Sequence, residues 1–204
     1  GDGGRVIVWS DDYTNFSGSI TAKGSDDGKG GFVETSSKDN LQAFGSVDAS
    51  GGIAPGEWLL DPSNVTIGAS TSSGNTYSDF FEPDTQPATV AASSIISALE
   101  NVHVTITTHN GASGSGQEGN IVVSSSLANI NTKSSGRRLT LFAAEDITVS
   151  NTISSSGGPL DVRLRAQGNV VIDVNTDIIT KGGEFKVSGS NDDGDADVEQ
   201  SIDA

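Results

Sequence analysis

Residues 139–154 read LTLFAAEDITVSNTIS, and this stretch decides the fold. It holds three short segments of alternating apolar and polar residues, which are Leu139–Phe142, Asp146–Val149 and Thr152–Ser154. The glycines Gly157-Gly158 follow, and the pattern starts again at Leu160. A period of two is typical of β-strands that bury one face. Three short strands with their turns in one repeating unit describe one coil of a parallel β-helix.

Two kinds of strand recur along the chain. The first kind opens after a glycine, at Val6–Trp9, Phe32-Val33, Trp58–Leu60, Ile121–Val123, Leu139–Phe142, Leu160–Leu164 and Phe185–Val187. The second kind precedes the next glycine, at Ser19–Ala22, Ser46–Ala49, Asn129–Thr132, Thr152–Ser154 and Asp177–Thr180. The early units are 26 residues long and the later ones are shorter. This spacing predicts about seven or eight stacked coils.

The position of the apolar residues favours parallel coils over a β-sandwich. Some of them stand alone among Ser, Thr, Asn or Asp, and we expect these to point inward and stack into ladders: Ile20, Val47, Ile130 and Ile153. A sandwich would need hairpins with two-residue turns, and no Asn-Gly or Asp-Gly pair here joins two matched strands. We expect the glycines at turns between faces, where the backbone adopts φ > 0. The sequence therefore predicts an all-β solenoid.

One segment interrupts the period. Residues 68–92 are rich in Ser, Thr, Asn and Asp and contain Pro83 and Pro87, which predicts a loop protruding from the rod. Residues 93–100 predict a two-turn helix in which Ser93 caps the N-terminus and Ile95, Ile96 and Leu99 line one side. The predicted organisation is β-helix coils over 1–67, an extra-helical loop and short helix over 68–101, and further coils over 102–204. The last part ends in an acidic segment.

The composition limits the classes of partner. The 27 acidic and 11 basic residues give a formal net charge of −16, which repels phosphate backbones and anionic lipid headgroups. We therefore expect no nucleic-acid partner and no membrane insertion. Cysteine is absent, so disulfides cannot stabilise the fold. The chain begins with Gly1 and contains no Met, so we expect a segment of a longer parent whose export signal lies upstream.

Several motifs resemble a known family. They are Gly4–Asp12, Phe16–Gly24, Gly30–Ser36, the segment Trp58–Ile67 with its Leu-Asp-Pro motif, Val102–Thr107 and Gly119–Val123. Together they resemble the filamentous-haemagglutinin-like large exoproteins, or adhesins, of two-partner secretion systems. The resemblance implies a right-handed parallel β-helix, export through an outer-membrane transporter partner, and a secreted or bacterial cell-surface location. It also implies a role in adhesion, aggregation or filament formation, with a host or neighbouring-cell receptor or glycan as partner.

The acidic C-terminal segment is the candidate metal site. Oxygen-bearing side chains alternate at Asn191, Asp193, Asp195, Asp197 and Glu199, and Ca²⁺ takes about six to eight oxygen ligands. The spacing does not match an EF-hand loop, which needs glycine sixth and glutamate twelfth. A solvated acidic turn is the competing interpretation. The only cofactor that the sequence suggests is therefore Ca²⁺, bound by Asp193, Asp195, Asp197 and Glu199.

The sequence predicts no catalytic residue. His103 alternates with Val102 and Val104 and is expected to face outward, and no G-x-S-x-G nucleophile motif occurs. The enzymatic alternative is a polysaccharide lyase or hydrolase built on the β-helix. It would use the basic cluster of Arg137, Arg138, Arg163 and Arg165, whose last two members share an outer face with Asp161. One acid among arginines is more typical of a surface salt-bridge ladder or docking patch.

Three further expectations concern surfaces. Trp9 and Trp58 stand beside apolar residues and are expected to pack in the core or in a groove. The loop at 68–92 is the expected place of any specific contact, because rigid scaffolds carry function on their loops. Finally, an open β-helix has unpaired coil ends, so the rod is able to stack end to end into filaments.

Overall fold

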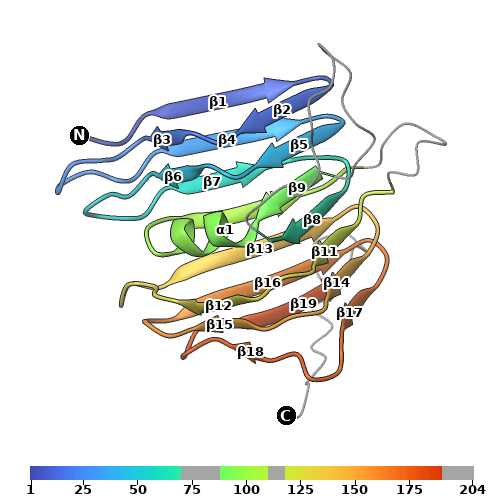
Figure 1. Cartoon of the computed structure of the whole chain (residues 1–204). Coiled ribbons are helices and arrows are strands. Elements are labelled where there is room, and N and C mark those ends of the chain that lie inside the picture. The colour runs from blue at the N-terminus through green and yellow to red at the C-terminus, as the bar shows by residue number, and fades with distance from the viewer. Residues whose placement is uncertain (70–87, 110–117, 190–204) are drawn as a thin grey trace.

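The computed structural model describes residues 1–69, 88–109 and 118–189, and it is a β-solenoid of about six turns with one short helix. Every pairing between its strands is parallel. Figure 1 shows the strands stacked from β1 at one end to β19 at the other. The predicted all-β parallel solenoid with a short helix is therefore confirmed.

Two faces of the solenoid are seven-stranded sheets. Sheet A has the order β1 (Arg5–Ser10), β4 (Phe32–Ser37), β7 (Glu57–Leu60), β10 (His103–Thr107), β13 (Arg137–Ala143), β16 (Leu160–Ala166) and β19 (Phe185–Gly189). Sheet B has the order β2 (Tyr13–Phe16), β5 (Asn40–Ala43), β9 (Ala88–Ala91), β8 (Val65–Gly68), β11 (Ile121–Val123), β14 (Ile147–Val149) and β17 (Val170–Ile172). In each turn the chain passes through sheet A and then through sheet B before it reaches the third face.

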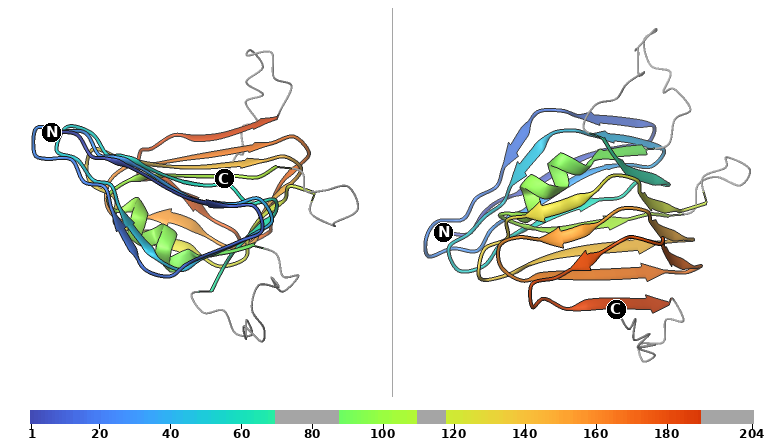
Figure 2. Two further views of the ribbon diagram at one scale, coloured as in Figure 1. Left: turned by 90° about the horizontal axis from the view of Figure 1, so that it is seen from above. Right: turned by 60° about the horizontal axis from the view of Figure 1, so that its bottom comes forward.

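The third face is divided by the helix. Its strands are β3 (Ser19–Thr21) and β6 (Ser46–Asp48) on one side of α1 (Ala92–Leu99), and β12 (Leu127–Ile130), β15 (Ile153–Ser155) and β18 (Ile178–Ile179) on the other. The helix contacts both β6 and β12 and so takes the place of a strand in this face (Figure 1). The view along the stack in Figure 2 shows the helix on the third side of the coil.

The core consists of stacked columns of apolar side chains, as the alternation predicts. In sheet A one such column is fully buried over Val33, Trp58, Val104, Leu139 and Val162, which lie opposite one another in register. Val47, Ile130 and Ile153 also lie in the core, and Ile20 packs against it. Burying one such side chain contributes about 1.5–3 kcal/mol, so these columns stabilise the solenoid without disulfides.

The solenoid has about six turns, fewer than predicted, and one predicted strand belongs to a different face. Ile121–Val123 was expected to open a coil, but this strand is β11 and pairs with β8 and β14 in sheet B. The coil is opened instead by β10, which pairs with β7 and β13 in sheet A. Apolar alternation identifies a strand but carries no information about which face of the coil the strand joins.

The turn that contains the helix has an unusual path. Strands β8 and β9 both lie in sheet B and pair with each other, whereas β7 pairs directly with β10 in sheet A. An α-helix is about 10 Å wide, which matches roughly two strand spacings of about 4.8 Å. Sheet B therefore gains one strand at the level where the third face accommodates a helix. The protruding loop was expected to reach Ala92, but Ala88–Ala91 form β9; residues 70–87 lie outside the described residues.

The helix exists as predicted but begins one residue earlier, and its predicted cap is wrong. The N-cap residue is Ala91, no side chain caps the helix, and Ser93 lies inside the first turn. Ile95, Ala98 and Leu99 are buried against the neighbouring faces, while Ile96 is only partly buried. So short a helix is marginal by itself, and this packing stabilises it.

A ladder of polar side chains precedes successive strands of sheet B. The Asn64 Oδ1 atom accepts the backbone N–H groups of Gly119 and Asn120, both at 2.7 Å. Asn120 Oδ1 accepts the N–H of Asp146 at 3.0 Å, and Asp146 Oδ1 accepts the N–H of Asn169 at 2.6 Å. We call these residues, Asn64, Asn120, Asp146 and Asn169, the corner ladder. It satisfies backbone donors at the turns and fixes the register of consecutive coils.

Close approach of the backbone, rather than positive φ, explains a stack of glycines before sheet A. A Cβ atom on Gly31 would lie 2.1 Å from the carbonyl oxygen of Gly4, and one on Gly56 would lie 2.0 Å from that of Gly31. Among the described glycines, positive φ occurs at Gly119, Gly136 and Gly182. The expectation that the glycines provide φ > 0 at turns therefore applies to these three, and not to the stacked positions.

Candidate functional site

The predicted calcium ligands lie outside the described residues. Asp193, Asp195, Asp197 and Glu199 all follow residue 189, so calcium binding there stays a prediction. Within residues 1–69, 88–109 and 118–189, no group of three or more His, Cys, Asp or Glu side chains is placed to hold a metal ion. The candidate chemistry of the described residues therefore lies on the outer face of sheet A and at the corner between sheets A and B.

The outer face of sheet A brings together the charged residues predicted to share it. Arg138 lies opposite Asp161 in the register of β13 and β16, and Arg165 lies opposite Phe142. Arg163 lies opposite Lys186 of β19, a basic residue that the sequence analysis did not include in the cluster. The predicted outward position of Arg163, Arg165 and Asp161 is confirmed by their alternation with buried neighbours.

These charged side chains have partners within the face. Arg163 Nη2 lies 3.0 Å from Glu184 Oε2, and Asp161 Oδ1 accepts the backbone N–H of Glu184 at 2.9 Å. The guanidinium of Arg165 stacks over the ring of Phe142 at 4.8 Å, a cation–π contact. Exposed pairs of this kind contribute little to stability, and they restrain the geometry of the patch. The described contacts include one ion pair on this face, Arg163 with Glu184, so a ladder of salt bridges stays a prediction.

Arg137 does not belong to this patch. Its side chain is buried on the opposite face of β13, where Nη1 donates to Ser135 Oγ and to the carbonyl oxygen of Gly136. Burial lowers the pKa of Arg137 below its ordinary value. The basic cluster proposed from the sequence is therefore divided between the two faces of the strand.

His103 faces outward as predicted and is held as a neutral acceptor. Its Nδ1 atom accepts the backbone N–H of Arg138 at 3.1 Å, which requires the ring proton to be on Nε2. Burial lowers the pKa of His103, and the cations of Arg138 and Arg137 lower it further, although Glu57 and Asp161 act in the opposite direction. Protonation of His103 would remove the acceptor and break this contact.

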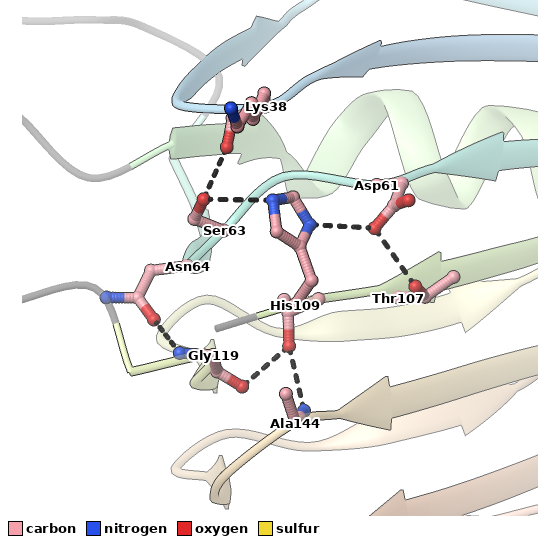
Figure 3. Close-up of polar contacts among 9 residues, drawn as sticks. Lys38, Asp61, Ser63, Asn64, Thr107, His109, Gly119 and Ala144 are labelled. Atoms are coloured by element: carbon pink, nitrogen blue, oxygen red, sulfur yellow. Dashed lines mark hydrogen bonds and ion pairs between the residues drawn. The ribbon is translucent and has the colours of Figure 1, made fainter. Parts of the chain in front are cut away.

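The corner between sheets A and B assembles an Asp, a Ser and a His, which sequence reasoning missed. His109 Nε2 lies 3.3 Å from Ser63 Oγ, and His109 Nδ1 lies 3.4 Å from Asp61 Oδ1 (Figure 3). Thr107 Oγ1 donates to the same Asp61 oxygen at 3.1 Å. Asp61 and Ser63 follow β7, and His109 follows β10, which pairs with β7. These are the residue types of a nucleophilic triad in the corresponding order of contacts.

The proton positions argue against Ser63 as a nucleophile in this arrangement. The Ser63 hydroxyl donates to the backbone carbonyl oxygen of Lys38, and its single proton is thereby used (Figure 3). Ser63 is also fully buried, so its oxygen is not open to a substrate. A nucleophilic serine instead donates to the histidine and is accessible. The contacts of this cluster therefore have a structural role: they connect the turn after β4, the turn after β7 and the end of β10.

The sequence analysis did not predict this cluster because its residues are far apart along the chain. His109 lies 46 positions from Ser63 and 48 from Asp61, and only the parallel pairing of β7 with β10 brings them together. The available signal was the Leu-Asp-Pro-Ser-Asn motif at residues 60–64 combined with one of only two histidines in the chain. That signal gave no indication of which coil would stack on the motif.

The two tryptophans have different environments. Trp58 is fully buried, donates from Nε1 to Thr35 Oγ1 at 2.9 Å, and packs edge-on against Phe16 with ring centroids 6.2 Å apart. The expected core position of Trp58 is confirmed. Trp9 is 53% exposed on the end strand β1, so the expectation that it packs in the core or a groove is wrong. Trp9 alternates with the inward-facing Val6 and Val8 of β1, so its side chain lies on the outer face of sheet A with Ile7.

One shallow hollow lies beside the helix. It is lined by Ser17, Gly18, Phe44, Gly45, Ser46, Ser93, Ser94 and Ser97. Its hydroxyl groups come from α1, from β6 and from the turn that precedes β3. The hollow is a polar surface depression and contains none of the predicted site residues.

The comparisons do not assign the chain to a family: neither a family model nor a curated protein matches it. In the part of the chain that the structure describes, no helix has the length and apolar character needed to span a membrane.

Proposed function

We propose that this chain is a structural and adhesive segment of a secreted bacterial surface protein, and that it mediates attachment, aggregation or filament formation. A parallel β-solenoid is compatible with this role, because stacked coils give a rigid rod whose length scales with the number of repeats. The motifs that resemble filamentous-haemagglutinin-like exoproteins support the same role. They also support export through an outer-membrane transporter partner and a location at the bacterial surface.

The observation that carries the proposal is the direct pairing of β8 with β9. Val65 to Gly68 pair in continuous register with Ala88 to Ala91, so residues 70–87 are inserted into the chain without breaking the stack. A rigid scaffold that accommodates an insertion at one level is suited to presenting that insertion to a partner. We therefore assign receptor or glycan contact to residues 70–87.

A loop replacement tests this assignment. Residues 70–87 would be exchanged for a Gly-Ser linker of equal length, and residues 110–117 would be exchanged in the same way as the matched control. Binding of the labelled proteins to cultured epithelial cells, to bacterial cells and to a glycan array is then measured by fluorescence. We expect loss of binding with the first variant alone, while circular dichroism shows an unchanged melting temperature. Equal binding by both variants and the parent protein would refute the assignment.

The alternative function is a polysaccharide lyase or hydrolase. It is favoured by one observation, the placement of Asp161 beside Arg138, Arg163 and Arg165 on a single outer face. Incubation with acidic and neutral polysaccharides, followed by measurement of new reducing ends and of unsaturated products, distinguishes the two functions. Turnover that is lost in Asp161→Asn would support the enzyme, whereas binding without product supports the adhesive role. Ser63→Ala is the control for the corner cluster and should leave any such turnover unchanged.

A further inference from the structure

The hollow beside α1 lies between the helix and two successive coils, and its volume is about 210 Å³. Gly18 and Gly45 occupy equivalent positions in these coils, just before β3 and β6. The backbone N–H of Ser46 donates to the carbonyl oxygen of Gly18 at 2.9 Å. A Cβ atom added to Gly45 would lie 2.5 Å from the same oxygen, so the two turns are in close contact. An added Cβ on Gly18 would meet no atom within 4 Å, so this turn borders open space.

Serine hydroxyls surround the hollow. Ser17 and Ser46 come from the two coils, and α1 contributes Ser93, Ser94 and Ser97. Ser93 and Ser97 are four residues apart, so they lie on the same side of the helix, and both are exposed. A serine hydroxyl both donates and accepts hydrogen bonds. None of the eight residues that line the hollow is charged.

Ser94 is the residue that indicates a ligand. Only 6% of its surface is exposed, yet it lines the hollow. Among the described residues its hydroxyl has no hydrogen-bond partner, and its oxygen is not enclosed by protein, so the hollow reaches it. A buried hydroxyl without a partner is unfavourable, and buried polar groups normally have one. A ligand in the hollow would supply the missing partner of Ser94.

The volume and the lining favour one neutral sugar unit as that ligand. Sites for drug-sized molecules have volumes of about 300–1,000 Å³, so this smaller hollow suits a ligand with a single ring. Phe44 offers an apolar ring surface to the C–H face of a sugar, and the serines match sugar hydroxyls, which also donate and accept. An anion is disfavoured, because no Lys or Arg lines the hollow and the net charge of −16 repels it.

We propose that the hollow beside α1 is a subsite for one neutral hexose unit of a glycan, with Ser94 as a hydrogen-bond partner and Phe44 as the apolar contact. The site exists because a helix takes the place of a strand in the third face and brings three serines to the turns of the neighbouring coils. It goes beyond the function proposed above, since none of its residues belongs to 70–87. Failure of this proposal would therefore leave the assignment of that loop unaffected.

A sugar titration followed by backbone amide chemical shifts in two-dimensional NMR tests the site. The probes are the methyl glycosides of glucose, galactose and mannose, with inorganic phosphate as the probe for an anion site. We expect one glycoside to bind with a Kd of about 1 mM, which is typical of a small ligand with few contacts, and to shift most strongly the amides of Gly18, Gly45, Ser93 and Ser94. Phosphate should shift none of them.

Three results of the titration would overturn the proposal. The first is the absence of shifts with all three glycosides at tens of millimolar. The second is a set of shifts that is largest at residues away from the hollow. The third is a response of these amides to phosphate and to none of the glycosides, which would identify an anion site.

The variant Ser94→Ala separates ligand contact from a structural role. The hydroxyl has no protein partner and alanine is favourable in a helix, so we expect a melting temperature that is unchanged or slightly higher. The Kd of the glycoside should rise about fivefold, as for the loss of one hydrogen bond. Ser126→Ala is the matched control, because this exposed serine precedes β12 and does not line the hollow. A Kd equal to the parent's in Ser94→Ala, or an equal rise in Ser126→Ala, would overturn the proposal.

A second variant keeps the test decisive if Ser94→Ala lowers the melting temperature. Ser93→Ala/Ser97→Ala removes two exposed hydroxyls of the hollow and leaves the buried side of α1 intact. We expect the Kd of the glycoside to rise about tenfold or more, as for the loss of two hydrogen bonds, with an unchanged melting temperature. An unchanged Kd in this double variant would also overturn the proposed site.

Discussion

Removing the first side chain of the corner ladder should cost a predictable amount of stability. Asn64 Oδ1 accepts two backbone N–H groups, from Gly119 and Asn120, each at 2.7 Å. Asn64→Ala leaves both donors without their protein acceptor in a partly buried turn. The net contribution of a hydrogen bond is about 1 kcal/mol, so we expect a loss of about 2 kcal/mol. For a chain of this size this corresponds to a decrease in melting temperature of about 4–8 °C.

Urea unfolding followed by far-ultraviolet circular dichroism measures this loss, with a constant denaturant slope as the condition for comparing variants. Asn64→Asp keeps an oxygen acceptor and should stay within about 0.5 kcal/mol of the parent protein. Asn151→Ala is the matched control, because its exposed Nδ2 makes one bond, to the Ser124 carbonyl oxygen at 2.9 Å. The reasoning is refuted if Asn64→Ala is as stable as the parent, or if Asn151→Ala is equally destabilising.

Three further outcomes are expected. Leu141→Ala removes a fully buried residue of the core column and should lower the free energy of unfolding in urea by about 2–5 kcal/mol. Thr140 is the outward-facing neighbour, and Thr140→Ala should lower it by less than about 0.5 kcal/mol. Similar losses in the two variants would contradict the assigned faces. The pKa of His103 is lowered from its ordinary value of 6.5 by burial and by Arg138, so its unfolded form binds protons more readily. His103 should therefore leave the free energy of unfolding unchanged above pH 6.5 and lower it as the pH falls below that value. His103→Gln should reduce this dependence of the unfolding free energy on pH, and an unchanged dependence would exclude His103 as its source. Gly136 has φ of +73° with no backbone atom closer than 3.4 Å to an added Cβ, so Gly136→Ala should cost about 1 kcal/mol from conformation alone, and a melting curve identical to the parent's would contradict this.

The strands were predictable because their signal is local. Segments such as Leu139–Phe142 and Leu160–Leu164 alternate apolar and polar residues, and each forms a strand whose inward side chains are fully buried. The helix was predictable for the same reason, although its cap was not. Ser93 is a favourable capping residue, but packing of Ile95 and Leu99 against the neighbouring faces set the helix start one residue earlier. Tertiary packing overrode the local preference.

The candidate site was predictable only in part. Alternation placed Asp161, Arg163 and Arg165 on one outer face, and the structure confirms that placement. Which residues they meet on neighbouring coils, such as Phe142 and Glu184, depends on register. The turn lengths that determine register vary from coil to coil, so sequence spacing alone did not reveal these contacts.

The sequence by itself determined that the chain forms short parallel strands with one inward face, because apolar periodicity is a property of neighbouring residues. Only the tertiary structure decided which coils are adjacent, and two features depend on that adjacency. His109 reaches Asp61 because β10 stacks on β7, and β9 enters sheet B between β5 and β8. Stacking joins residues separated by a whole turn or more, and their contacts depend on the length and path of the intervening chain. No short-range pattern encodes that path.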